Sequence, residues 1–359
     1  MAKPVENGIA QMPSDKPLEM RWLFSSMDLE EKKNEETFGM KCKRVVKSLI
    51  GVTLALSSGI CLGLSGVFSL LAVNQGVTEI QILIVQGICM VLVSCPFVLY
   101  FKLKVLPDSY TDRVILFIMG ILENLANLAY YYSMSYISGV GDVTAMYCAA
   151  VPVFTPLMAS LVLREPWKPV RHGISTILNL TGILLISLPS IQANQGKTYT
   201  DVNVFDDSLG YTLAVLCSLG LCTNAVLARA FTTEVSVFTI LLYSGLVGTP
   251  ISFALNFTTN SGKIAIIDIS KAVGSLSGKI IFYILYFGFR YRSLHYEAAT
   301  SVVLLGNIEI VAAYIGDALL FSNTPTSVQI VGVALVIISA MLVAFMTGRA
   351  HVRESRDWA

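Results

Sequence analysis

Long apolar blocks alternate with short polar connectors along almost the whole chain. Ten of these blocks come close to the roughly 20 residues that a helix needs to cross the hydrocarbon core of a bilayer. The blocks are too long for β-barrel strands and lack their alternation of apolar and polar residues, so helices are the structure expected in lipid. The predicted spans are 48–70, 80–101, 113–137, 141–163, 172–189, 208–229, 236–257, 275–294, 298–321 and 327–347.

The composition agrees with this pattern. Hydrophobic residues make up 54% of the 359 residues and charged residues only 14%, with a mean hydropathy of +0.68. An average soluble domain carries about a quarter charged residues. The charges of this chain are concentrated near its two ends and in the connectors. We therefore predict an all-α membrane protein with ten transmembrane helices.

The basic residues predict the orientation of these spans. Alternate connectors and the two flanking segments carry sixteen Lys and Arg residues, whereas the other connectors carry at most four: Lys197, Lys263, Lys271 and Lys279. Lys and Arg are enriched on the cytosolic side of membrane proteins. We therefore expect both termini in the cytosol. The pattern is compatible with the plasma membrane and with endomembranes.

An internal repeat appears when the chain is shifted by 159 positions. The sequence GVTLA at 51–55 then meets GYTLA at 210–214, Tyr132 meets Tyr291, and Pro166 meets Pro325. One offset thus relates several spans of the first half to spans of the second half. Each half holds five spans, and because five is odd the second half must enter the membrane from the opposite side. This inverted repeat favours transport by alternating access.

Several segments resemble a known transporter family. The fourth span, YCAAVPVFTPLMASLVLREP at 147–166, and the end of the ninth, LLFSNTPTSVQIVG at 319–332, resemble the EamA-type drug/metabolite transporter superfamily. The stretches SGVFSLLAV at 65–73 and TGILLISLP at 181–189 are most similar to the G subgroup of the nucleotide-sugar-transporter-like solute carrier family 35. The family's acidic residue after helix four is matched by Glu165, but the second repeat has Thr324 there.

The resemblance and the span pattern together predict the domain organisation. We expect a disordered cytosolic tail at 1–44, a first five-helix repeat at 45–189 and an outer linker at 190–207. A second repeat at 208–348 and a cytosolic tail at 349–359 complete the chain. The resemblance also implies a central cavity lined by helices three, four, eight and nine.

Two carboxylates interrupt the apolar spans. Glu123 and Glu309 each lie near the middle of their span, where a charged group costs on the order of 2.5–3.5 kcal/mol on insertion scales. They must face a cavity, find partners or carry a proton. Gly306, Ala313 and Gly316 share the helix face of Glu309, and such a face suits either a ligand or a closely packed helix. Asp317 lies near the outer end, where solvation or helix capping is the expected role.

Other polar residues are candidates for binding or coupling. Asn127 follows Glu123 by four residues and shares its helix face, so it either holds the carboxylate or joins it in binding. The nearby tyrosines at 130–132 would then form an interfacial belt. Asn307 lies about 200° around the helix from Glu309, so the two would meet one solute only if the helix were unwound. Tyr147, in the fourth span, is the remaining candidate.

Arg290 lies near the cytosolic end of the eighth span and has two interpretations. It either extends to the lipid headgroups or turns inward, where a guanidinium would bind an anionic solute through paired hydrogen bonds. We therefore predict a secondary transporter or exchanger of a small polar metabolite, with an organic anion as one option. Coupling to a proton or a counter-solute is a further option. A homodimer is another, because Gly59 and Gly63 have the GxxxG spacing that permits close helix contact, although packing inside the bundle is the expected use of these two glycines.

The sequence offers little for other classes of protein. The net charge of +1 and the lack of a basic stripe argue against nucleic acid. The segment GSLSGK at 274–279 is too short for a phosphate-binding loop, and the three histidines are scattered. We expect no enzyme activity, cofactor or metal, with membrane lipids and a small solute as partners. The alternative is a transporter-like protein with a regulatory or scaffolding role through its tails.

Overall fold

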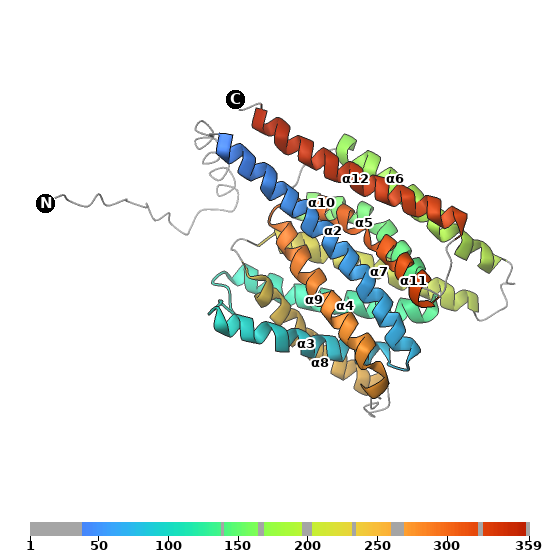
Figure 1. The fold of residues 1–359 in the computed structure, drawn as a ribbon. Coiled ribbons are helices and arrows are strands. Elements are labelled where there is room, and N and C mark those ends of the chain that lie inside the picture. The colour runs from blue at the N-terminus through green and yellow to red at the C-terminus, as the bar shows by residue number, and fades with distance from the viewer. Residues whose placement is uncertain are drawn as a thin grey trace.

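The structure, a computed structural model, describes residues 38–137, 140–163, 169–195, 203–231, 235–259, 269–321 and 326–356. This part of the chain is all helical (Figure 1). The helices are α2 (Phe38–Asn74), α3 (Glu79–Tyr100), α4 (Tyr110–Tyr136), α5 (Val140–Val162), α6 (Pro169–Gln195), α7 (Asn203–Arg229), α8 (Val237–Thr259), α9 (Ile269–Leu294), α10 (Ala299–Gly306), α11 (Glu309–Phe321) and α12 (Ser327–Arg356).

Each predicted span corresponds to a helix or, for the ninth, to the pair α10 and α11. Within the described residues, nine helical segments are long and apolar enough to cross a membrane. The tenth, α6, has a shorter apolar section at Gly173–Ile186. The all-α membrane fold is therefore confirmed. Glu165, Pro166, Thr324 and Pro325, which entered the sequence comparison, lie outside the described residues.

The two halves pack on each other reciprocally. Gly51 at the start of α2 approaches Tyr296 and Glu297, which follow α9. At its counterpart 159 positions later, Gly210 near the start of α7 approaches Tyr136 and Ile137 at the end of α4. The repeat thus relates the contact between α2 and α9 to the contact between α7 and α4. It likewise relates the contact between α5 and α7 to the contacts of α10 and α11 with α2. The inverted repeat predicted from sequence is confirmed.

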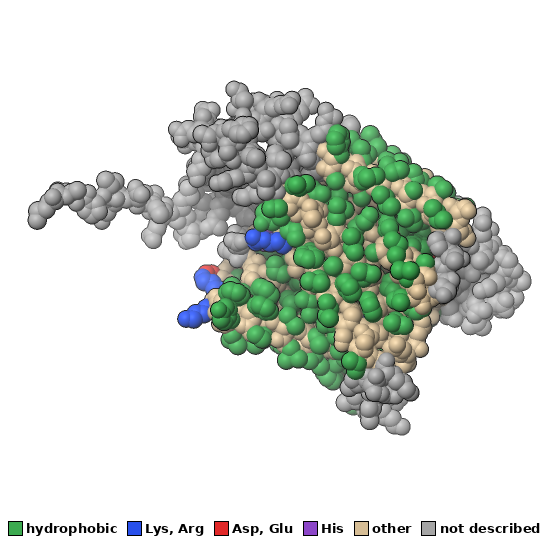
Figure 2. Space-filling view, in the orientation of Figure 1, with side chains coloured by type: hydrophobic (Ala, Val, Ile, Leu, Met, Phe, Trp, Pro, Cys, Tyr) green, Lys and Arg blue, Asp and Glu red, His purple; other side chains and the backbone are tan. Residues whose placement is uncertain are grey.

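The connectors with many basic residues meet at one end of the bundle. Thr239 donates a hydrogen bond to the carbonyl of Lys104 at 3.4 Å, and the Arg229 guanidinium donates to the carbonyl of Leu294 at 2.5 Å. The same end holds the start of α2 and the end of α12 (Figure 1). Figure 2 shows Lys and Arg side chains at this edge of the molecule and a largely hydrophobic surface elsewhere on the described part of that face. We call it the basic end.

The ninth span is broken where α10 meets α11. At the break, Ile308 N–H bonds to the Leu305 carbonyl and Ile310 N–H bonds to the Asn307 carbonyl, at 3.3 and 3.2 Å. These tighter i to i−3 bonds replace the regular helical pattern. A single helix was expected over 298–321, and that detail is wrong. The break changes the direction of the side chains that follow it.

Neighbouring helices explain the position of the break. Gly59 and Gly63 of α2 pack so closely that a Cβ on either would clash with the carbonyl of Gly306 or Glu309. From the other side, the Asn307 amide donates to the Asn179 side-chain oxygen of α6 at 3.1 Å. The GxxxG spacing of α2 is therefore used inside the bundle, which leaves the predicted homodimer without support from these two glycines.

Candidate functional site

Two adjoining cavities lie at the centre of the bundle. Cavity 1 has a volume of about 30 Å³ and cavity 2 of about 20 Å³. Leu62, Tyr147, Leu221 and Tyr286 line both of them. The four helices implied by the family resemblance all contribute, and α2 and α7 contribute as well. The six predicted site residues line these cavities: Tyr147, Arg290, Asn307 and Glu309 in cavity 1, and Glu123, Asn127 and again Tyr147 in cavity 2.

Arg290 faces cavity 1. Its guanidinium donates to the Tyr286 hydroxyl at 2.5 Å and to the Leu221 carbonyl at 2.9 Å, and it lies over the Tyr286 ring. The interpretation that Arg290 extends to the lipid headgroups is therefore wrong. A guanidinium has five N–H donors, so these two bonds leave donors for a ligand. Within the described chain, no carboxylate forms an ion pair with it.

Glu309 and Asn307 both line cavity 1 because of the break in the ninth span. Glu309 is 4% exposed, and its Oε1 has no hydrogen-bond partner in the described chain. The Tyr147 hydroxyl, in the same cavity, is also buried without a partner there. Buried polar atoms normally have partners, so these two are candidate contacts for a bound solute or proton. Glu309 also begins α11, where the helix dipole favours negative charge.

Glu123 differs from Glu309 in having protein donors. Its two carboxylate oxygens accept hydrogen bonds from the Tyr283 hydroxyl and the Asn224 amide. Asn127 does not bond to the carboxylate but donates to the Tyr283 hydroxyl at 2.7 Å and to the backbone carbonyl of Glu123 at 2.8 Å. Asn127 thus orients Tyr283, and Tyr283 in turn holds Glu123. Asn224 was not singled out in the sequence, because its partner lies on a different helix.

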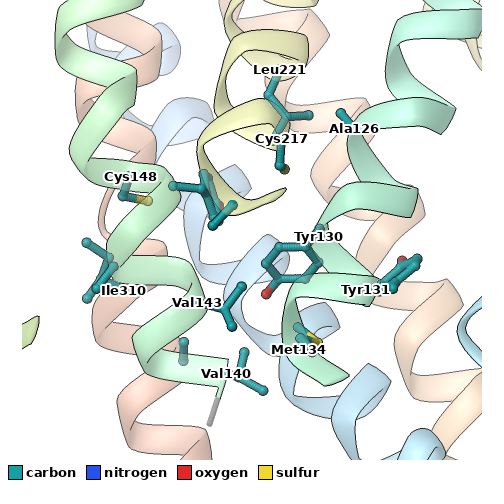
Figure 3. Packing of buried hydrophobic residues seen from close by; sticks show 14 of the residues in the cluster. Ala126, Tyr130, Tyr131, Met134, Val140, Val143, Cys148, Cys217, Leu221 and Ile310 are labelled. Carbon is teal, nitrogen blue, oxygen red and sulfur yellow. The ribbon is translucent and has the colours of Figure 1, made fainter. Parts of the chain in front are cut away.

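Two of the three tyrosines after Asn127 do not belong to an interfacial belt. Tyr130 and Tyr131 are 8% and 2% exposed, and Figure 3 shows the Tyr130 ring inside the bundle near Val143. Tyr130 contacts the Tyr147 ring edge-on at 5.7 Å, and its hydroxyl lies 3.2 Å from that of Thr144. The Tyr131 hydroxyl donates to Gln86 of α3 at 3.0 Å. Both tyrosines line cavity 2.

Lys279 is a buried charged residue that the sequence analysis misplaced. It was grouped with the outer connectors, but its side chain is fully buried in α9. The ammonium donates to the Gln86 side-chain oxygen and lies over the rings of Tyr131 and Tyr283, at 5.3 and 4.6 Å from their centroids. The spacing of Lys279, Tyr283, Tyr286 and Arg290 along one helix face was the available signal.

Asp317 has the capping role expected of it. It is 4% exposed, and its Oδ2 accepts a hydrogen bond from the Gly141 N–H at the start of α5 at 2.9 Å. Beside it, the Tyr314 hydroxyl donates to Asp142 at 2.7 Å. These bonds join α11 to the N-terminus of α5 at the end opposite the basic end. Asp317 lines neither central cavity.

The fold and the cavities define a class of protein. Two inverted five-helix repeats around a central cavity are an architecture found in membrane transporters. The chain belongs to the EamA-like transporter family, which it matches over residues 49–188 and 208–345. It is a multi-pass integral membrane protein of a family that carries small solutes.

Similar proteins support the same subgroup. Solute carrier family 35 member G1 of Homo sapiens is 22% identical over 271 residues, which cover 74% of this chain and 71% of that protein. The Mus musculus protein of the same name is 24% identical over 277 residues, covering 74% and 70%. A solved crystal structure with 15% identity has a TM-score of 0.60 and covers 85% of this chain and 98% of its own. That similarity concerns the fold alone.

Proposed function

We propose that this protein is a secondary active transporter or exchanger of a small organic anion, which binds in cavity 1 during alternating access. The observation that carries the proposal is the Arg290 guanidinium, directed into a central cavity without a carboxylate partner. A guanidinium in a dry environment binds carboxylate or phosphate strongly and in a defined orientation. The unpaired Tyr147 hydroxyl and the Asn307 amide line the same cavity and would orient the solute.

Glu309 is the residue proposed to bind the coupling proton. Its carboxyl group lies in the same cavity as Arg290 and has an oxygen without a hydrogen-bond donor. Glu123, by contrast, already accepts hydrogen bonds from two protein donors. Proton binding at Glu309 would remove a negative charge next to the anion. It would thereby link the proton gradient to solute binding.

Uptake into proteoliposomes tests both assignments. The purified protein is supplied with a pool of succinate, citrate, UDP-glucose and glutamate, with and without an imposed pH gradient. Wild type should take up at least one anion and respond to the gradient. Arg290→Gln should reduce uptake at low solute concentration by about tenfold, as expected for the loss of a charge-assisted hydrogen bond. Glu309→Gln should still bind solute but no longer respond to the gradient.

A matched control is available on the same helix. Arg292 lies two residues from Arg290, is exposed and packs on the Tyr296 ring, outside both cavities. Arg292→Gln should therefore leave uptake unchanged. Equal losses for Arg290→Gln and Arg292→Gln would count against the anion site. Lack of uptake of every solute by folded wild type would instead favour the alternative of a regulatory or scaffolding protein.

Both termini are proposed to lie in the cytosol, because the basic end gathers most of the Lys and Arg residues. Protease or tag accessibility at either terminus in sealed vesicles tests this orientation directly.

A further inference from the structure

The inward face of α9 carries a cation at each end. Lys279, Tyr283, Tyr286 and Arg290 follow at intervals of four, three and four residues, so they lie on one face of the helix. The rise of a helix separates Lys279 from Arg290 by about 16 Å. Each cation contacts the nearer tyrosine, Lys279 over the Tyr283 ring and Arg290 over the Tyr286 ring. The face is thus nearly symmetric about its centre.

The two cations differ in their access to the cavities. Arg290 is half-buried and lines cavity 1. Lys279 is fully buried and lines neither cavity, but the two rings that it contacts, Tyr131 and Tyr283, both line cavity 2. Its ammonium therefore lies directly behind the wall of cavity 2. Cavities 1 and 2 share lining residues, so the space beside Arg290 continues toward that wall.

Lys279 forms no ion pair in the part of the chain that the structure describes. Its one hydrogen bond to a side chain is to the neutral Gln86, and no carboxylate in the described chain forms an ion pair with it. An ammonium has three donors, and an unpaired charge in the middle of a bilayer is costly and commonly functional. Gln86 also accepts from Tyr131. The amide oxygen thus connects the ammonium to the ring that separates it from the cavity.

We propose that Lys279 is a second binding site for the transported anion, used in the conformation that opens to the end opposite the basic end. In the present structure Gln86 takes the place of the anion and the rings of Tyr131 and Tyr283 close the site. The anion would be received by Arg290 at the basic end and by Lys279 at the other. This inference rests on the proposed function, because it concerns the same solute and the same cavities.

The charges along the route are compatible with this role. Glu123 lies between the two cations and accepts a hydrogen bond from Tyr283, on the face that joins them. The two cationic side chains, Lys279 and Arg290, outnumber the single carboxylate of Glu123. The three groups together therefore favour an anion. Glu123 also prevents the solute from being held equally well along the whole route. It thereby separates two binding positions.

Sided kinetics test the proposal. Wild type, Lys279→Gln, Arg290→Gln and Arg292→Gln are reconstituted, and the KM is measured separately from each face. The probe is whichever of succinate, citrate, UDP-glucose and glutamate wild type takes up fastest. Lys279→Gln should raise the KM about tenfold from the end opposite the basic end and less than about twofold from the basic end. Arg290→Gln should show the reverse asymmetry, and Lys279→Arg should restore the wild-type KM.

The outcomes separate the two proposals. Suppose that Arg290→Gln raises the KM measured from the basic end, whereas Lys279→Gln changes neither of the two KM values or changes both equally. The second site is then refuted and the proposed function stands. If wild type transports no anion, both fail. Loss of maximal rate with an unchanged KM in Lys279→Gln would show a purely structural role and would also refute the site.

A labelling experiment on wild type remains decisive if Lys279→Gln does not fold. The membrane-impermeant reagent sulfosuccinimidyl acetate is added from the end opposite the basic end, and acetylation of Lys279 is measured by mass spectrometry with and without the transported anion. The proposal requires that Lys279 be acetylated and that the anion protect it. Absence of acetylation, or acetylation that the anion does not reduce, would overturn it.

Discussion

At the scale of single residues, the two buried glutamates differ in their hydrogen-bond donors. We predict that Tyr283→Phe destabilises the protein by about 1–3 kcal/mol, because it leaves a buried Glu123 oxygen without its donor. Thermal unfolding in detergent measures the effect. Tyr100→Phe is the control, since Tyr100 is 81% exposed, and it should be neutral. Equal stability of the two variants would contradict the assignment of Tyr283 as the support of Glu123.

The individual site residues show what a sequence can and cannot predict. Glu123, Glu309 and Arg290 were recognisable because a charged residue inside an apolar span is energetically costly and commonly functional. Lys279 was missed because its span begins close to it in the hydropathy pattern, which makes an outer connector equally plausible. Gln86 and Asn224 were missed because neutral amides are common in transmembrane helices. Their role depends on contacts with Lys279 and Glu123 from other helices.

At the scale of helices, the break in the ninth span depends on close packing by α2. We predict that Gly63→Ala destabilises the protein, because the added Cβ would clash with the Glu309 carbonyl and with Ala312. The expected loss is about 1–3 kcal/mol, measured by thermal unfolding. Gly288→Ala in α9 is the matched control, since nothing lies within 4 Å of its added Cβ. It should be neutral or stabilising by up to about 1 kcal/mol.

A second helix-scale prediction concerns the cap of α5. Asp317→Ala removes the acceptor for the Gly141 N–H, and loss of such a cap costs about 0.5–2 kcal/mol. We expect a lower unfolding temperature with little change in the KM for solute, because Asp317 lies outside both cavities. Asp108→Ala in an exposed connector is the control. A large change in KM with unchanged stability would show that Asp317 acts on the solute instead.

Hydropathy could not have shown the break between α10 and α11. The residues from 298 to 321 are largely apolar, with Thr300, Ser301, Asn307, Glu309 and Asp317 as the polar exceptions, and such a run predicts one helix. What interrupts it is the approach of Gly59 and Gly63 from a helix some 250 residues earlier in the chain. The same break places Asn307 and Glu309 in one cavity. Long-range packing therefore determined the part of the site that local pattern left open.

At the scale of the whole molecule, the repeat was predictable because an inverted repeat preserves sequence wherever helices must approach closely. Gly51 and Gly210 are equivalent in the repeat, and both permit contact between a helix of one half and the end of a helix of the other. Such small residues survive the divergence of the two halves. The cavities, in contrast, are lined by residues that differ between the halves, for example Arg290 and its counterpart Tyr131.

Under the proposed alternating access, the two equivalent glycines predict which end of the molecule each one keeps closed. Gly51 packs at the basic end and Gly210 at the opposite end, and an added side chain at either would push apart the contact that closes that end. Gly51→Val should therefore favour the conformation open at the basic end, and Gly210→Val the conformation open at the other. Labelling of Cys222, which lines cavity 1, by an impermeant thiol reagent added from each side measures this. Gly51→Val should speed labelling from the basic end and slow it from the other, while Gly210→Val does the opposite. If both variants shifted access in the same direction, the two ends would not be opened by equivalent movements of the repeats.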